Sequence, residues 1–249
     1  MTVGVVRRGP VAILTIDRPE RRNAFDGATT LALDTALNEF EDDITAHVAV
    51  LTGGPLVFSA GTDVVAWAGP PTERGGPYGI AGRRQRKPVI AAVEGVAAGG
   101  GFEIALAATL IVASSSASFS LPEVSLGLIA ECGGLFRTPR ALPLNVAREM
   151  LLTGAPLTAQ RGYDLGLVNQ ITEPGGALAA AMTIAERIAS LAPLAVRESL
   201  AVLEAIYDSA DTHGWAATSA ASAVVRGSQD AVEGVAAFKE KRPATWRGR

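Results

Sequence analysis

Short apolar runs rich in β-branched residues open the chain. Residues 3–6 and 11–16 form two such runs, and Arg-Arg-Gly-Pro at residues 7–10 separates them. A Gly-Pro pair between β-branched runs is typical of a hairpin turn. The pattern therefore predicts that the chain begins with two antiparallel strands.

Strand and helix patterns alternate over the next hundred residues. Asp26 is a suitable N-cap, and beyond it leucines and Phe40 recur near helical spacing up to the acidic residues 41–43. Buried strands are predicted at residues 48–51, 89–93 and 110–113, with a helix at residues 99–108. This order predicts an α/β fold built from repeated β-β-α units.

Two later stretches depart from that alternation. Residues 69–82 are rich in Gly and Pro and show neither period, which predicts a mobile surface segment and a candidate lid. Alanine- and leucine-rich helical patterns dominate from residue 145, most clearly at residues 177–191, 194–207 and 218–225. The last third of the chain is therefore expected to be helical and to pack on itself or on a neighbouring subunit.

Composition and charge exclude several classes of protein. The chain has 249 residues, 48% of them hydrophobic, which is enough for a globular core, and its net charge of −3 gives no basic field for nucleic acid. Without a secretory pattern or a run of about 18 apolar residues, we expect a cytoplasmic protein that does not enter a membrane. Cys132 is the only cysteine, and with His47 and His213 it supplies too few ligands for structural zinc, so no metal is expected.

Residues 95–136 are the most informative window. Their only charged side chains are Glu103, Glu123 and Glu131, whereas the chain average of 19% charged residues would give about eight. Such depletion indicates a buried layer, where a lone carboxylate costs several kcal/mol unless it is paired or has a raised pKa. These three acids are therefore candidates for chemistry, with a solvated position at the rim as the alternative for each.

Two glycine turns point to an anion site. Gly-Gly-Gly at residues 99–101 begins a predicted helix and offers free backbone N–H groups. The run lacks both the Lys-Ser/Thr of a P-loop and the spacing of a dinucleotide fold. A second turn at residues 58–64, Phe-Ser-Ala-Gly-Thr-Asp-Val, could aim another N–H group at the same point, which would make an oxyanion hole.

These motifs resemble those of a known enzyme superfamily. Residues 58–63, 91–95 with 99–103, and 121–123 with 127–129 are similar to signatures of the enoyl-CoA hydratase/isomerase (crotonase) superfamily, and they fall in family order; the likeness extends to residues 18–24, 152–154, 166–168 and 237–242. The spacing between Glu103 and Glu123 resembles that of the hydratase branch. The resemblance implies an α/β crotonase (ClpP-like) spiral of β-β-α repeats in residues 1–190, which hold the active site, and a C-terminal helical trimerisation region in residues 191–249.

The resemblance also implies a reaction. Backbone N–H groups of Thr62 and Gly100 would form the oxyanion hole, Glu103 would activate water, and Glu123 would supply the α-proton. The expected activity is enoyl-CoA hydratase, which adds water across the 2,3 double bond of an acyl-CoA thioester. No cofactor is expected, because coenzyme A is part of the substrate.

The resemblance further implies contacts to coenzyme A and an oligomer. The candidate coenzyme contacts are Arg18, Arg21, Arg22, Ala24, Ala60, Gly61 and Asp63. Phe238 and Lys241 resemble tail residues that reach the nucleotide part from another subunit of a homotrimer or a dimer of trimers. Trp67, Tyr78 and Phe136 are candidates for the acyl pocket, with core packing as the alternative for each.

One departure from the hydratase pattern keeps other activities open. Ala-Glu-Cys at residues 130–132 stands where hydratases commonly carry Pro-Gly. The resulting third acid, Glu131, resembles the dienoyl-CoA isomerase and carnitinyl-CoA dehydratase branches and could shuttle a proton; alternatively it faces solvent or pairs with Arg137 or Arg140. A double-bond isomerase and a non-catalytic CoA-binding or RNA-binding relative are the remaining alternatives.

Overall fold

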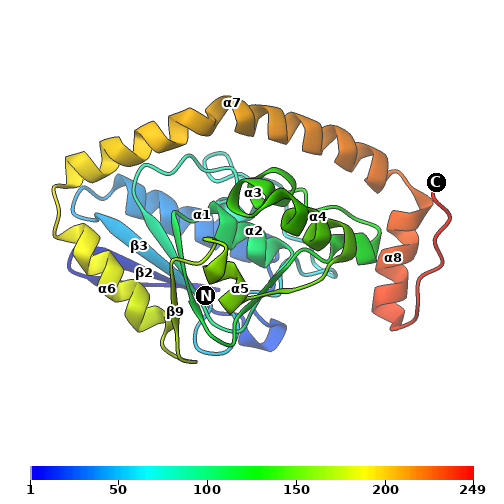
Figure 1. The fold of residues 1–249 in the computed structure, drawn as a ribbon, viewed down its shortest axis with the longest axis horizontal. Coiled ribbons are helices and arrows are strands. Elements are labelled where there is room, and N and C mark those ends of the chain that lie inside the picture. Colours follow the sequence, from blue (N-terminus) through cyan, green and yellow to red (C-terminus); the bar gives the residue numbers. More distant parts are fainter. Residues whose placement is uncertain (1) are drawn as a thin grey trace.

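A six-stranded sheet forms the centre of the computed structural model, which describes residues 2–249 (Figure 1). Its strand order is β1-β2-β3-β4-β6-β9, and only the β1–β2 pair is antiparallel. The strands are β1 (Val3–Arg8), β2 (Val11–Ile16), β3 (Val48–Thr52), β4 (Val89–Val93), β6 (Leu110–Ser114) and β9 (Gln170–Thr172). The hairpin predicted at the start of the chain is thus confirmed.

The remaining elements surround this sheet. A small sheet holds β5 (Val96–Ala98), β7 (Ser118–Ser120) and β8 (Leu157–Thr158) in the order β5-β7-β8. The helices are α1 (Gly27–Asp42), α2 (Gly100–Ala107), α3 (Gly134–Ala141), α4 (Leu144–Thr153), α5 (Ala159–Asp164), α6 (Ala177–Ala189), α7 (Pro193–Arg226) and α8 (Gln229–Glu240). Three short 3-10 turns are η1 (Pro19–Arg21), η2 (Pro77–Gly79) and η3 (Glu123–Leu126).

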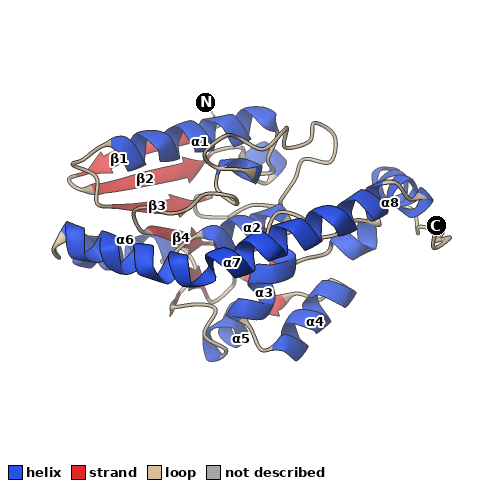
Figure 2. Ribbon diagram, turned by 90° about the horizontal axis from the view of Figure 1, so that it is seen from above, coloured by secondary structure: helices blue, strands red, loops and turns tan. Residues whose placement is uncertain are grey.

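Helices cover both faces of the large sheet, which explains its uniformly apolar strands. Every residue of β3 and β4 is buried. Leu14 and Leu51 pack into the core that includes Leu33 of α1, whereas their strand neighbours pack with α6 (Figure 2). Parallel strands covered on both faces lose the alternation of apolar and polar residues, because both sets of side chains are buried.

The β-β-α repeats are present as predicted. The hairpin of β1 and β2 leads to α1, and β4 with β5 leads to α2. Asp26 caps α1 by accepting a hydrogen bond of 2.8 Å from the backbone N–H of Thr29. The repeats matter for function because the turn from β5 into α2 brings the glycine run to the same place as the turn after β3.

The prediction of a mobile lid at residues 69–82 is wrong for its second half. Tyr78 and Ile80 are buried, and η2 packs against α1. The adjoining Arg83 is buried and pairs with Glu41 of α1 at 3.0 Å. Glycines in this segment allow close backbone approach rather than mobility, since a Cβ at Gly79 would lie 2.7 Å from the Asp34 nitrogen.

The two C-terminal helices predicted at residues 194–207 and 218–225 form one helix of 34 residues, α7. The stretch between them lacks apolar periodicity but contains no proline, and Gly214 within it packs directly on Phe136. This tertiary contact offsets the low helix propensity of glycine.

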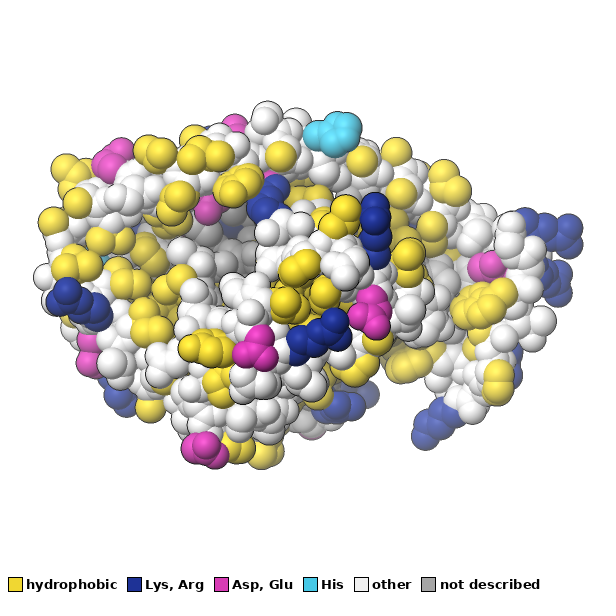
Figure 3. Space-filling model, in the orientation of Figure 1, with side chains coloured by type: hydrophobic (Ala, Val, Ile, Leu, Met, Phe, Trp, Pro, Cys, Tyr) yellow, Lys and Arg dark blue, Asp and Glu magenta, His cyan; other side chains and the backbone are white. Residues whose placement is uncertain are grey.

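The C-terminal helices reach back to the rest of the chain. Helix α7 runs along one side of the molecule, and α8 turns back beside η3 (Figures 1 and 2). Apolar side chains follow α7 along the upper edge in Figure 3. Among residues 2–249, no single helix is long and apolar enough to cross a membrane.

Candidate active site

A cavity of about 1030 Å³ lies between the sheet layer and the C-terminal helices. Its walls come from the loops before α1 and after β3, from the start of α2, from η3 and the turn after it, and from α7 and α8. Its volume reaches the upper end of the range of ligand pockets. A large, elongated ligand therefore fits the site.

Two backbone turns meet at one wall of this cavity. Gly61 has a φ of 91°, and a Cβ there would lie 2.6 Å from the Ala98 carbonyl oxygen and 3.0 Å from the Gly100 nitrogen. Only glycine allows this approach. It brings the turn that carries Thr62 against the start of α2 at Gly100; both residues line the cavity, and neither backbone N–H group donates to an acceptor within residues 2–249.

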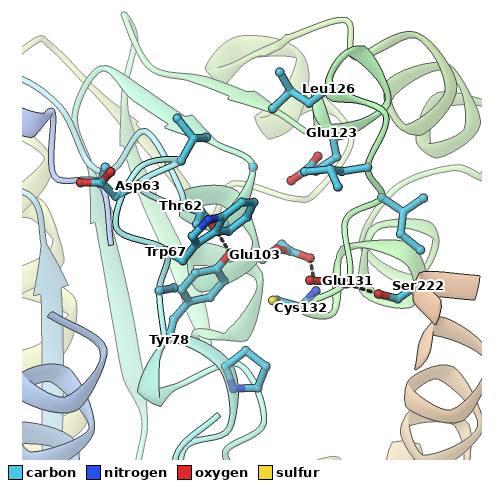
Figure 4. A pocket seen from close by; sticks show the side chains of 18 of the residues that line it. Thr62, Asp63, Trp67, Tyr78, Glu103, Glu123, Leu126, Glu131, Cys132 and Ser222 are labelled. Atoms are coloured by element: carbon cyan, nitrogen blue, oxygen red, sulfur yellow. Dashed lines mark hydrogen bonds between the residues drawn. The ribbon is translucent and has the colours of Figure 1, made fainter. Parts of the chain in front are cut away.

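Tyr78 packs against the cavity wall that Thr62 and Gly100 form. Its ring lies directly against Gly100, and its hydroxyl group shares a 2.7 Å hydrogen bond with Thr62 Oγ1 (Figure 4). Phe25 holds the ring from the side in an edge contact at 5.5 Å between ring centroids. Burial and the nearby Cys132 and Glu103 raise the pKa of Tyr78 well above its usual value, so the side chain remains a neutral phenol.

Glu103 projects from the first turn of α2 and is only 2% exposed. Its Oε1 accepts backbone hydrogen bonds from Cys132 at 2.7 Å and from Gly134 at 2.9 Å. A Cβ at Gly134 would lie 3.0 Å from this oxygen, so glycine there leaves the space that the carboxyl group needs.

Glu123 faces Glu103 from the start of η3. Its Oε2 is buried and has no hydrogen-bond partner among the described residues. A Cβ at Gly99 would lie 2.9 Å from its Oε1, so this carboxyl group lies against the glycine run. An unpartnered oxygen on the cavity wall is available to a bound molecule.

The two carboxyl groups have raised pKa values. Burial, followed by the charge of Glu123, raises the pKa of Glu103 to about 8. Burial raises the pKa of Glu123 to about 7. A coupled pair of this kind holds one proton near neutral pH, which leaves one protonated group that can donate a proton and one ionised group that can accept one.

Glu131 lies across the cavity and is held by α7. Its carboxylate accepts a hydrogen bond from the Ser222 hydroxyl group (Figure 4). It also accepts hydrogen bonds from both Nε and Nη2 of Arg226. Although burial opposes it, these contacts lower the pKa of Glu131. The alternative partners Arg137 and Arg140 are therefore wrong; Arg140 pairs instead with Asp211.

The mouth of the cavity carries unpaired positive charge. Arg21 and Arg22 line it together with Ala24, Ala60 and Asp63. Neither arginine forms an ion pair within residues 2–249.

Arg18 is placed differently from the other predicted coenzyme contacts. Its guanidinium group donates to the Ala24 carbonyl oxygen at 2.5 Å and pairs with Asp26 at 3.1 Å and Asp63 at 3.3 Å. It does not line the cavity. In this geometry Arg18 holds the loop that carries Arg21 and Arg22.

Of the predicted coenzyme contacts near the C-terminus, one lines the cavity and one does not. Phe238 of α8 lines the cavity of its own chain, whereas Lys241 and Gly61 do not line it. Trp67 and Tyr78 line the cavity as expected, but Phe136 does not; its ring packs on Trp215 at 5.1 Å.

No group of three or more His, Cys, Asp or Glu side chains in residues 2–249 is arranged to hold a metal ion.

Several lining residues carried no signal in the sequence. Ser222 and Arg226 are 91 and 95 positions from Glu131, and only the course of α7 brings them to the site. Trp215 and Thr218 reach the cavity in the same way. Their contribution depends on tertiary packing that no local motif encodes.

Comparison with known proteins settles the family. The sequence model described as enoyl-CoA hydratase/isomerase matches residues 7–249. The chain belongs to the enoyl-CoA hydratase/isomerase family. Carnitinyl-CoA dehydratase of Salmonella arizonae is 39% identical over 98% of this chain and 97% of its own length.

Solved structures of this family share the fold. Carnitinyl-CoA hydratase from Mycobacterium avium has 41% identity and a TM-score of 0.94, covering 100% of this chain and 99% of its own. Enoyl-CoA hydratase from Mycobacterium tuberculosis has 40% identity and a TM-score of 0.79, with the same coverage. The crotonase fold implied by the motifs is confirmed, whereas trimerisation stays a prediction.

Proposed function

We propose that this protein is an enoyl-CoA hydratase that adds water across the 2,3 double bond of an acyl-CoA thioester. The observation that carries the proposal is that Thr62 and Gly100, whose backbone N–H groups have no acceptor within residues 2–249, line one cavity with two buried carboxyl groups, Glu103 and Glu123. Family membership supplies the thioester as substrate class. The combination matches what conjugate addition of water requires.

The N–H groups polarise the substrate. As the water oxygen bonds to C3, the electron pair of the C2–C3 double bond moves toward C1, and negative charge develops on the thioester oxygen. The N–H groups of Thr62 and Gly100 donate to this oxygen. Donors fixed in advance stabilise the charge without reorganising, and the loss of one such donor commonly costs about a hundredfold or more in rate.

The carboxyl pair moves the protons. Two N–H donors stabilise a negative charge on Glu103, whereas the buried Oε2 of Glu123 has no partner. The pKa values of about 8 and about 7 belong to the coupled pair, so the hydrogen-bond donors decide which group is ionised, and we assign the shared proton to Glu123 in the working state. Glu103 accepts the proton of the attacking water, Glu123 donates its proton to C2, and return of the proton from Glu103 to Glu123 restores the pair.

The mouth suits the coenzyme. Arg21 and Arg22 carry the unpaired positive charge that phosphate groups need, and Phe238 adds an apolar surface to the same cavity. These contacts hold the thioester with its enoyl group directed toward Glu103 and Glu123.

The test is a hydration assay with crotonyl-CoA, in which the loss of the enoyl thioester absorbance is monitored. Isomerisation of 3-enoyl and 3,5-dienoyl thioesters is measured in parallel. Hydration faster than either isomerisation supports the proposal, and isomerisation without hydration contradicts it.

Dehydration of a carnitinyl-CoA-type thioester is the second candidate, because the similar Salmonella protein is named a carnitinyl-CoA dehydratase and the similar M. avium protein a carnitinyl-CoA hydratase. It is the same chemistry run in reverse and uses the same carboxyl pair. The two candidates differ in the acyl group, since carnitine carries a trimethylammonium group on the carbon beyond C3.

A further inference from the structure

The cavity contains a niche with the chemistry that recognises cations. Glu131 supplies an ionised carboxylate, and the Trp67 ring supplies an aromatic face that is 37% exposed. Both residues line the cavity that holds Glu103 and Glu123. An acid beside an aromatic face attracts ammonium and guanidinium groups.

The protein fills this niche with its own cation. The Arg226 guanidinium group forms two hydrogen bonds to the Glu131 carboxylate, and its central carbon lies 5.9 Å from the centre of the Trp67 ring. Ser222, one helical turn earlier on α7, donates to the same carboxylate. The contacts to Glu131 raise the pKa of Arg226 further, so its charge is permanent.

The placement of α7 fixes Arg226 there. The residue ends the 34-residue helix, and Trp215, Thr218 and Ser222 line the cavity along the same helix. A continuous helix, rather than a flexible loop, therefore positions Arg226 beside Glu131.

We propose that Arg226 is a specificity-determining residue that occupies the cation niche of Glu131 and Trp67, so that the site accepts an uncharged acyl group and rejects one that ends in trimethylammonium. This inference rests on the proposed function and specifies its substrate class. A cationic acyl group has to displace Arg226 from Glu131 or lie beside it, whereas an uncharged group meets a neutral ion pair.

The experiment compares two thioesters of the same shape that differ in charge, 4-trimethylammoniocrotonyl-CoA and its uncharged isostere 5,5-dimethylhex-2-enoyl-CoA. The wild-type protein is expected to favour the uncharged thioester in kcat/KM by about tenfold or more. Arg226→Met opens the niche without a charge and is expected to lower that preference at least about tenfold. Arg226→Lys retains a cation and is expected to keep most of the preference.

Two further variants make the interpretation specific. Adding Glu131→Gln to Arg226→Met removes the acid from the opened niche and is expected to abolish the gain for the cationic thioester. Arg187→Met removes an exposed arginine from α6 and serves as the matched control.

Two outcomes overturn the inference: equal use of both thioesters by the wild type, or an unchanged preference in Arg226→Met. If the wild type hydrates neither thioester, the proposed function fails. The ratio of the two dissociation constants, measured by calorimetry for wild type and Arg226→Met, then decides the inference by the same criteria.

Discussion

Glu103 and Glu123 differ in the hydrogen bonds that the protein donates to their carboxyl oxygens. Glu103 has two backbone donors, and Glu123 has a buried oxygen without a partner. Charge on the first is stabilised by two N–H groups from another segment, while the second has only its own backbone N–H group to favour its ionised form. The proposed division between a base and an acid thus rests on main-chain geometry around two identical side chains.

Replacing either acid tests this division. Glu123→Gln is expected to lower kcat for crotonyl-CoA hydration by about a thousandfold or more, and Glu103→Gln by about a hundredfold or more, because each removes one proton transfer. Thioester affinity should persist, as measured by calorimetry. Glu186→Gln, on an exposed position of α6, is the control, and full activity in both active-site variants would reject the assignment.

The pH profile follows from the same pair. Because Glu103 and Glu123 are coupled, the pKa values of about 8 and about 7 belong to the pair, which holds one proton between these values. Below about pH 7 both carboxyl groups are protonated and no base remains; above about pH 8 both are ionised and no acid remains. We expect kcat/KM to rise toward pH 7 and to fall beyond pH 8, and a flat profile from pH 6 to 9 would contradict this assignment.

At the scale of single residues, the sequence predicts the backbone turns and the carboxyl groups of the cavity, but not the α7 residues on the other side of the cavity. Thr62, Gly100, Glu103 and Glu123 lie in recognisable local motifs, and the fold brings them to one cavity. Arg226 lies 95 positions from Glu131, so its pairing depends on where a long helix ends. Their roles in catalysis stay predictions until they are measured.

Among the elements, the contact between α8 and η3 bears most directly on the acid pair. The Gly234 position in α8 lies against the Leu126 carbonyl group, and Gly127, with a φ of 64°, lies against the Asp230 backbone. Two glycines therefore let the helix approach the 3-10 turn that carries Glu123. The position of this acid depends on a C-terminal helix far from it in sequence.

Gly234→Ala tests that dependence. The added Cβ would overlap the Leu126 carbonyl group, so α8 has to move away from η3. We expect the free energy of unfolding to fall by about 1–3 kcal/mol and kcat/KM to fall with it. Denaturant unfolding and the crotonyl-CoA assay measure the two effects.

Gly227→Ala is the matched control, since a Cβ there meets ordinary contacts at 3.4 Å and 3.6 Å. Equal stability and activity of the two variants would contradict a positioning role for this contact.

Element type proved easier to predict than element extent. The strands at residues 48–51, 89–93 and 110–113 are each confirmed to within one residue, because they are short apolar runs. The length of α7 was not predictable, since its polar middle is held by packing of Gly214 on Phe136. The sequence also does not predict that the second half of residues 69–82 is buried, because glycine there allows close packing rather than mobility.

For the whole molecule, the cavity joins both parts of the chain. Loops of the core supply the N–H groups and the acids, while α7 and α8 supply Ser222, Arg226 and Phe238. Part of residues 191–249 therefore lines the cavity of the candidate site, in addition to any role in assembly.

Helix α7 also presents an unpartnered apolar face. Six large apolar side chains near its start are between 44% and 65% exposed, and those within the helix recur at helical spacing: Leu191, Leu194, Val202, Leu203, Ile206 and Tyr207. Exposed apolar surface of this kind marks a protein interface. It is consistent with the homotrimer or dimer of trimers implied by the family resemblance.

Assembly can be tested by charging that face. Leu203→Arg combined with Ile206→Arg is expected to shift the protein from a trimer or hexamer toward the monomer in sedimentation velocity, because buried arginines without partners would oppose association. Ile44→Arg replaces a 90% exposed isoleucine outside α7 and should leave the sedimentation coefficient unchanged. A wild type that sediments as a monomer would contradict the oligomer, and a double variant that still assembles would exclude this face as its interface.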